Sequence, residues 1–407
     1  MLIDKLRSFS WDRRGILAGL ILVIGFFLAF PFASFLLLLA IVVLTSSLYR
    51  TDKWVVLILC VYSVVAVGPL LALKLPIEAF GNDKSQYLDF MSTMGAAGAD
   101  HFIKVQPELV SFFSLYCAWK LFGATDAAFL FLFVASFTLA IATIWKGGYQ
   151  SLPLFILLIL SSSAFYASYG NVIRQAMAFP FIFLLIFEER KRRLPFYMIL
   201  AMLAHIPSLI ITVPYFLCRI LGRYAFPIIG VVTAIAFIAF RYIGTSINFL
   251  SSDDGYVSKK MALYTNWESY SIVSVAIVAL TIAVIVNIAA RQLLQKIKVG
   301  EKMDGARYIG YAIVMSNICV LGMMAAYSIP KVFERIYIYF FVIAMLTLSM
   351  VISRMAAGQK KVVLCCVIVI YSTFGISKNI AAQNLLYHGN SLNYFTDNLF
   401  DIYNFLF

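Results

Sequence analysis

The sequence predicts an all-α protein that crosses a membrane many times. The chain has 407 residues, of which 63% are hydrophobic and 13% are charged, and its mean hydropathy is +0.93. Soluble domains are typically about 45–50% apolar and about 25% charged. Apolar runs recur from residue 15 to residue 377 with no soluble block between them. We therefore expect one polytopic integral membrane domain over residues 1–407, and not several soluble domains.

The lengths of the apolar runs predict about twelve transmembrane helices, because about 20 apolar residues span a bilayer as a helix. Residues 107–122 are shorter and more mixed, which favours an interfacial or re-entrant helix. The expected spans are 14–31, 33–49, 54–74, 126–145, 151–169, 171–187, 195–217, 226–245, 270–290, 307–328, 335–353 and 361–377.

The net charge of +13 lies mainly in short basic clusters between the apolar runs, such as "EERKRR", "RQLLQKIK" and "SRMAAGQKK". Cytoplasmic loops of membrane proteins show this pattern. The charge therefore indicates orientation and not a nucleic-acid partner. With the clusters inside, we expect residues 75–125, including the short helix, to lie outside. The loop 246–269 and the amphipathic tail 378–407 are expected on the same outer side.

One part of this expected topology has the wrong number of membrane crossings. Two full spans, 195–217 and 226–245, lie between an inside cluster and an outside loop, which requires an odd number of crossings. Pro207 and Pro214 interrupt the first of them. A broken or re-entrant helix over 195–217 resolves the conflict, because proline removes a helix hydrogen bond and irregular backbone at membrane depth has to be buried in protein.

Polar side chains collect in four stretches on the expected outer side. Arg174 is the most unusual of them, because it stands between two long apolar runs. A charge at bilayer depth costs about 2.5 kcal/mol or more, so it needs an aqueous cavity or an anionic partner. The stretches are "GNDKSQY" with Asp83 and Tyr87, "NVIRQ" with Asn171, Arg174 and Gln175, "AHIPS" with His205 and Ser208, and "KVFERIYIYF" with Lys331, Glu334, Arg335 and Tyr339.

These stretches resemble the motifs of the EpsG/Wzy-like family of bacterial polysaccharide polymerases. "NVIRQAMAF", a basic loop and "MLAHIPSLIITVP" are similar to its N-x-x-R-Q-x-x-A and F-H-x-S-A-L-I patterns. "NDKSQYLDF" and "VQPELVSFFSLYCAWKLFG" resemble its outer-loop segments, and "FERIYIYF" resembles its R-hydrophobic-x-x-Y-F stretch. The resemblance runs in order over roughly residues 80 to 400.

The resemblance implies a GT-C-like membrane enzyme that polymerises repeat units of O-antigen, capsule or exopolysaccharide. Its substrates would be undecaprenyl-diphosphate-linked oligosaccharides, and a chain-length regulator would be a further partner besides the lipid bilayer. The location would be the bacterial inner (cytoplasmic) membrane, with the active site facing the periplasm or exterior. The reaction would be metal-independent inverting glycosyl transfer without a cofactor.

The chemistry of such a reaction assigns expected roles to the polar residues. A lipid diphosphate needs fixed cations, and the arginine fork donates paired hydrogen bonds to phosphate, so Arg174 and Arg335 are the expected diphosphate ligands. A general base needs a pKa near neutral, which favours His205. Asp83 and Glu334 are its rivals for this role. Gln175, Asn171, Tyr87 and Tyr339 are expected to bind the sugars.

Each assignment has a structural alternative. Arg174 could anchor a helix end by snorkelling, and Arg335 could belong to a plain interfacial cluster with Glu334. His205 could simply hydrogen-bond a neighbouring helix, and an aspartate such as Asp83 in a polar loop usually serves solvation. An O-antigen ligase would use the same donor, and a flippase for lipid-linked sugars is the alternative from another class. The absence of an obvious repeat favours an enzyme over a transporter.

Overall fold

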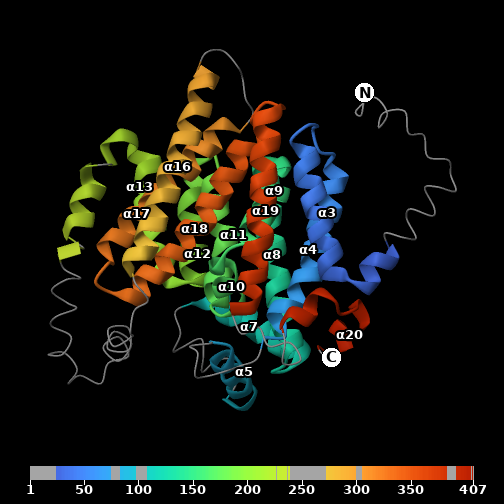
Figure 1. Ribbon diagram of the computed structural model, residues 1–407. Coiled ribbons are helices and arrows are strands. Elements are labelled where there is room, and N and C mark those ends of the chain that lie inside the picture. Colours follow the sequence, from blue (N-terminus) through green and yellow to red (C-terminus); the bar gives the residue numbers. More distant parts are fainter. Residues whose placement is uncertain are drawn as a thin grey trace, which may run out of the picture.

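The computed structural model is a bundle of α-helices (Figure 1). It describes residues 24–74, 83–97, 108–225, 227–235, 237–238, 272–298, 305–382, 391–404 and 406, and this part of the chain contains no strand. The long helices are α4 (Lys53–Ala72), α8 (Asp126–Gly148), α16 (Ile272–Lys298), α17 (Ala306–Ala325), α18 (Pro330–Ser353) and α19 (Gln359–Ala382). Shorter helices are α3 (Pro31–Ser46), α5 (Lys84–Ala97), α7 (Leu109–Phe122), α9 (Leu152–Leu160), α10 (Ser163–Gly170), α11 (Ile173–Phe187), α12 (Leu194–Ala204), α13 (Leu209–Leu221) and α20 (Leu399–Asn404).

Six helices in the described residues are long and apolar enough to cross a membrane, or seven if α10 and α11 count as one bent span. The α10–α11 pair bends by 109°. The expected count of twelve is therefore not reached in the part of the chain that the structure describes. The expected span 14–31 lies mostly outside these residues, and so do nine of the 20 residues of the expected span 226–245. The α7 helix has 14 residues and falls among the shorter helices, in line with an interfacial or re-entrant segment.

Charged side chains define the two ends of the bundle. Lys84 donates from Nζ to the carbonyl oxygens of Ala72 and Lys74, each at 2.6 Å, and pairs with Asp126 Oδ1 at 2.6 Å. A cation at the end of α4 and an acid at the start of α8 both match the helix dipoles. Lys84 therefore joins α4 to α8 at the end of the bundle that we call the site end. The opposite end, which holds Arg50, Lys146 and Arg354, is called the basic end.

The expected single span at 195–217 is wrong, because this segment forms a hairpin of two short helices. The α12 helix ends at His205, whose Nδ1 lies 3.1 Å from Glu108 Oε1 at the site end. The α13 helix then returns, and Arg219 donates from Nη2 to the carbonyl oxygen of Glu188 at 2.7 Å, near the basic end. The chain is therefore broken at the expected place, and the hairpin enters and leaves at the basic end. The loop 246–269, on which the expected topology also depends, lies outside the described residues.

The local sequence explains the turn of this hairpin. His205 has extended backbone angles, φ −158° and ψ 107°, and the short 3₁₀ turn Ile206–Ser208 follows it. Pro207 has no backbone N–H, so α12 cannot continue through it. The turn leaves the side chain of His205 facing the start of α7.

The α18 helix lies at the centre of the bundle. Its apolar window is 78% buried, whereas the windows of α16 and α19 are 17% and 28% buried. A helix that is buried all round belongs to the core, and one with a large exposed apolar face suits contact with lipid. The core helix α18 carries Arg335 and Tyr339. These two side chains therefore enter the bundle interior and not the lipid-facing surface.

Candidate functional site

The carboxylate of Glu108, at the start of α7, links three parts of the chain at the site end. Glu108 Oε2 accepts a hydrogen bond from Arg174 Nη1 at 2.5 Å. Glu108 Oε1 accepts from the backbone N–H of Ile206 at 2.9 Å and lies 3.1 Å from Nδ1 of His205. An ionised carboxylate has no hydrogen to donate, so Nδ1 of His205 carries the proton in this contact. Each oxygen of Glu108 thus has its own partners.

The anionic partner that the sequence demanded for Arg174 is Glu108. Arg174 lies in the first turn of α11, directly after the bend from α10, and its side chain is only 16% exposed. Its Nε donates to the hydroxyl of Tyr87 at 3.2 Å. Its guanidinium also stacks near the ring of Tyr87, 5.7 Å from the centroid. The charge at this depth is therefore paired and held in one orientation.

The surroundings of Glu108 keep it ionised. Burial by itself would raise its pKa, but the hydrogen bond from His205, the charge of Arg174 and the backbone N–H of Ile206 lower it to about 2. Hydrogen bonds and opposite charges favour the charged form of a carboxylate, and here they outweigh desolvation. Glu108 is thus a fixed negative charge at neutral pH.

The second half of the site comes from the central helix. Gln175 follows Arg174 on α11, and its Nε2 donates to the backbone carbonyl of Arg335 at 2.7 Å. Nη2 of Arg335 lies 3.6 Å from Oδ2 of Asp83. Tyr339 lies one helical turn further along α18, and its ring centroid is 6.4 Å from that of His205. These contacts bring the stretches around residues 83, 174, 205 and 335 together at the site end.

Several buried polar atoms around this site have no hydrogen-bond partner within the described part of the chain. Buried polar groups in proteins are normally paired with protein or ordered water, so a group of orphans in one place is unusual. A site that binds a polar ligand supplies such partners from the ligand. The atoms are Nε2 of His205, Oε1 of Gln175, Oγ of Ser208, Nη1 of Arg335 and the hydroxyl of Tyr339.

The profile of the EpsG family matches residues 59–396. The chain belongs to the EpsG family. The matched region contains every residue of the site, and membership indicates a membrane protein of the polysaccharide-polymerase type. The resemblance of the sequence motifs to this family is thereby confirmed. No curated protein and no solved structure matches the chain.

Two of the expected site residues of this EpsG-family protein lie apart from the cluster around Glu108. Glu334 is 49% exposed and pairs with Lys331 at 3.0 Å on the surface of α18. Asn171 accepts a hydrogen bond from Nζ of Lys74, on the other side of the bend before α11. Burial, and then the positive charge of Lys84, lower the pKa of Lys74 to about 8, against the opposite effect of Asp83.

Sequence reasoning missed Glu108, although a signal was present. Glu108 is the only acidic residue in 107–122, and an apolar helix follows it directly. A charge at bilayer depth needs an aqueous cavity or an opposite charge. Arg174 therefore needs an anion, and Glu108 by the same argument needs a cation. Two opposite charges of this kind in one EpsG-family chain predict a pair, whatever their separation in sequence.

The arrangement can bind a polyanion and accept a proton beside it. Glu108 fixes the tautomer of His205, so Nε2 is left as a hydrogen-bond acceptor in the buried part of the site. A carboxylate that orients a histidine through its other ring nitrogen is a recurring device of proton-transfer sites. Arg335 adds a buried N–H donor near the same place. Base and cation are thus close together at the site end of this EpsG-family protein.

Proposed function

We propose that this EpsG-family protein polymerises undecaprenyl-diphosphate-linked oligosaccharide repeat units at the outer face of the bacterial cytoplasmic membrane. The observation that carries the proposal is His205 with Nδ1 bound to Glu108 and Nε2 unpartnered, at the same end of the bundle as Arg174 and Arg335. The basic end then faces the cytoplasm by the positive-inside rule. The site end faces the periplasm or exterior, in a GT-C-like arrangement.

In the proposed reaction, a hydroxyl of the acceptor repeat attacks the anomeric carbon of the donor chain. The hydroxyl proton goes to Nε2 of His205, a new glycosidic C–O bond forms, and the bond from the anomeric carbon to the diphosphate oxygen breaks. The lipid diphosphate leaves with the electron pair. Direct displacement inverts the anomeric centre. General base catalysis of this kind contributes about 10²- to 10⁴-fold.

The leaving diphosphate needs positive charge that does not have to be reorganised during the reaction. Arg335 has a buried Nη1 with no protein partner in the described residues, and its Nη2 lies 3.6 Å from Asp83. Arg174 is held by Glu108 and Tyr87 through Nη1 and Nε, which leaves its Nη2 for a ligand. A preorganised donor aimed at developing charge is worth about 3–4 kcal/mol. These two arginines take the role of a metal ion in the proposal.

The other expected residues divide into two groups. Oε1 of Gln175 and the hydroxyl of Tyr339 are buried and unpartnered, so they are the proposed sugar contacts. Tyr87 already binds Arg174, and Asn171 already binds Lys74, so the proposal assigns them to holding these cations in place and not to binding sugar. Asp83 pairs with Nη2 of Arg335 at 3.6 Å, so the proposal assigns it to holding that arginine and not to the role of the base.

A flippase for lipid-linked sugars is the second candidate, and one observation favours it. Transporters often have broken helices at their binding sites, and this chain has a 109° bend between α10 and α11 as well as the α12–α13 hairpin. The paired polar groups, however, gather at one end of the bundle and not at its midplane. This placement favours an enzyme that works at one membrane face.

The test is the replacement His205→Asn in cells that produce the surface glycan. The asparagine amide N–H can keep the contact with Glu108 while Nε2 is lost. We expect glycan that stops at a single repeat, with unchanged protein level in the membrane. Glu334→Gln is the matched control, because Glu334 is exposed and paired only with Lys331 among the described residues. We expect wild-type chain lengths from it.

Other outcomes identify the alternatives. Long chains that are not coupled to their acceptor would indicate a ligase, and lipid-linked repeats that accumulate on the cytoplasmic side would indicate a flippase. Wild-type chain lengths in His205→Asn would remove His205 from the catalytic role. A chain-length regulator, if one binds, would change the length distribution without producing the single-repeat product.

A further inference from the structure

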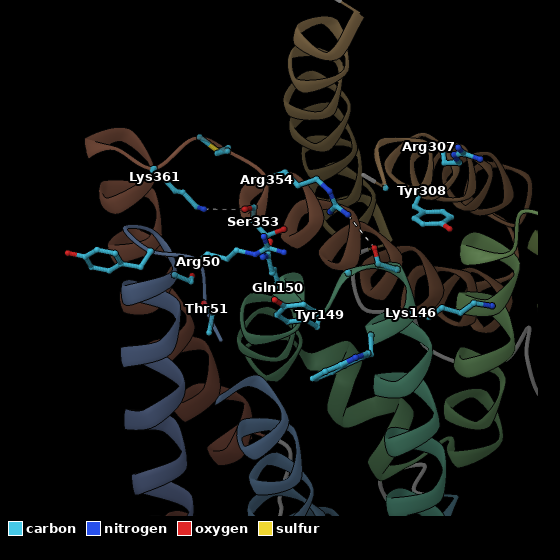
Figure 2. Close-up of a pocket in the computed structure, with 18 of the residues that line it drawn as sticks. Arg50, Thr51, Lys146, Tyr149, Gln150, Arg307, Tyr308, Ser353, Arg354 and Lys361 are labelled. Atoms are coloured by element: carbon cyan, nitrogen blue, oxygen red, sulfur yellow. Dashed lines mark hydrogen bonds between the residues drawn. The ribbon is translucent and has the colours of Figure 1, made fainter. Parts of the chain in front are cut away.

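A polar cavity lies at the basic end, opposite the cluster around Glu108. Its volume is about 830 Å³ (Figure 2), which is within the range of about 300–1,000 Å³ of small-molecule sites. Its walls come from the ends of α3, α8 and α18 and the beginnings of α17 and α19. The polymerase reaction proposed above takes place at the other end of the bundle and leaves this cavity without a role.

The cavity is strongly positive. Among the described residues, its lining includes five cationic side chains and one carboxylate, that of Glu189. In Figure 2 the cations lie on both sides of Tyr149 and Gln150, which also line the cavity. The positive-inside rule explains basic residues in loops at this end, but it does not require them to surround one hollow. The cations are Arg50, Lys146, Arg307, Arg354 and Lys361.

Contacts within the protein account for three of these cations. Arg307 Nη1 pairs with Glu189 at 3.0 Å. Arg354 donates to the carbonyl oxygen of Gly147 at 3.3 Å, and Lys361 donates to that of Ser353 at 3.2 Å. Both carbonyls lie at helix C-termini, where a cation is stabilised by the helix dipole. These contacts give the three cations a role in the fold without any ligand.

Arg50 and Lys146 have no such role. Neither side chain has an ion pair or a hydrogen bond within the described residues, although both line the cavity. Arg50 follows α3 and Lys146 lies in the last turns of α8, so two separate segments bring to one place cations that have no direct ion pair or hydrogen bond in the described residues. Like charges around a hollow repel one another, and an anion in the cavity would remove that repulsion.

We propose that this cavity binds an anion that carries phosphate groups. Guanidinium groups bind phosphate oxygens through two parallel hydrogen bonds, and lysine binds them as a point charge. The phosphate has two sources at this place. One is a soluble phosphate compound, and the other is the headgroup of an anionic phospholipid, since basic pockets between membrane helices take such headgroups.

The test compares two double variants of the full-length protein in nanodiscs of phosphatidylcholine. Arg50→Gln/Lys146→Gln removes the two cations of the lining that have no direct ion pair or hydrogen bond in the described residues. Lys53→Gln/Lys360→Gln removes the same charge at the same end, from exposed residues that do not line the cavity. Inorganic pyrophosphate is the soluble probe, measured by calorimetry. We expect at least tenfold weaker binding in the cavity variant, equal to about 1.4 kcal/mol, and wild-type binding in the control.

The second arm uses nanodiscs with one third phosphatidylglycerol, and native mass spectrometry counts the lipids that the protein retains. If the ligand is a headgroup, pyrophosphate binds weakly, and phosphatidylglycerol is retained by the wild type and the control but lost from the cavity variant. The proposal is overturned if neither probe distinguishes the cavity variant from the control. Polymerase activity is not part of this readout, so failure here leaves the proposed function untouched.

A gain-of-binding variant guards against misfolding as an explanation. Glu189→Gln removes the one carboxylate among the described residues of the cavity lining and frees Arg307 from its ion pair. We expect this variant to bind the same probe more tightly than wild type, by about threefold or more. Weaker binding, or binding equal to that of wild type, would contradict the electrostatic argument.

Discussion

The pair of Glu108 and Arg174 offers the sharpest test of the structure. Glu108 Oε2 binds only Arg174 among the described residues, while Oε1 binds His205 and Ile206. Glu108→Gln can therefore keep the Oε1 contacts and lose the ion pair alone. Removing one partner of a buried ion pair costs about 3–5 kcal/mol, because it leaves an uncompensated charge. The side chains are 6% and 16% exposed, which places the pair in this class.

The assay is the free energy of unfolding in mixed micelles, followed by circular dichroism during SDS titration. The variants are Glu108→Gln, Arg174→Met and the two combined. We expect each single variant to lose about 3–5 kcal/mol. We expect the combined variant to lose no more than the worse single one, because it leaves no buried charge. The coupling energy would then be about 3 kcal/mol, at the upper end of measured cycles.

Additive effects would refute this reasoning. If the combined variant loses the sum of the two single losses, the charges do not interact in the folded protein. If each single variant loses less than about 1 kcal/mol, the pair lies in water and not in the bundle, as exposed pairs contribute about that little. Either result would also remove the fixed orientation of Arg174 on which the proposed binding of the diphosphate depends.

Two further predictions follow from the geometry. The pKa of Glu108 falls from 4.5 to about 2 on folding, so the ionised carboxylate stabilises the folded protein fully above pH 4.5, and this contribution is lost as the pH falls toward 2. Wild type should therefore lose more unfolding free energy over this range than Glu108→Gln. Equal losses in the two proteins would contradict the lowered pKa. Gly147→Ala should destabilise the folded protein by about 1–3 kcal/mol, because a Cβ at this position overlaps the ring of Phe187. Gly310→Ala is the control: its Cβ meets nothing within 4 Å, so this variant should be neutral or stabilising in the same SDS titration. Equal stabilities of the two glycine variants would contradict the close contact of α8 with α11.

The sequence determined the class of protein and the residue types of the site. Hydropathy and basic clusters depend on local composition, so an all-helical membrane protein could be predicted directly, and the family followed from short motifs. The unusual position of Arg174 predicted a partner or a wet cavity, because the cost of a charge in lipid depends on the local sequence alone. Asp83, Gln175, His205 and Arg335 were found as polar residues on the expected outer side and as parts of the family's motifs.

The tertiary structure decided which of these residues act together. The partner of Arg174 is 66 residues away, and that of His205 is 97 residues away. Such pairs depend on how helices pack, and no local pattern specifies them. The exposure of Glu334 also depended on packing, because the rotation of α18 turns Arg335 inward and its neighbour outward.

The hairpin of α12 and α13 shows the same division. The sequence supplied the prolines and the topology conflict, which together showed that 195–217 is not an ordinary span. Only the contacts at its two ends, His205 with Glu108 and Arg219 with Glu188, showed that the chain turns back. Local sequence sets where a helix must end, because proline lacks an N–H; the direction the chain takes afterwards is set by the surfaces against which it packs.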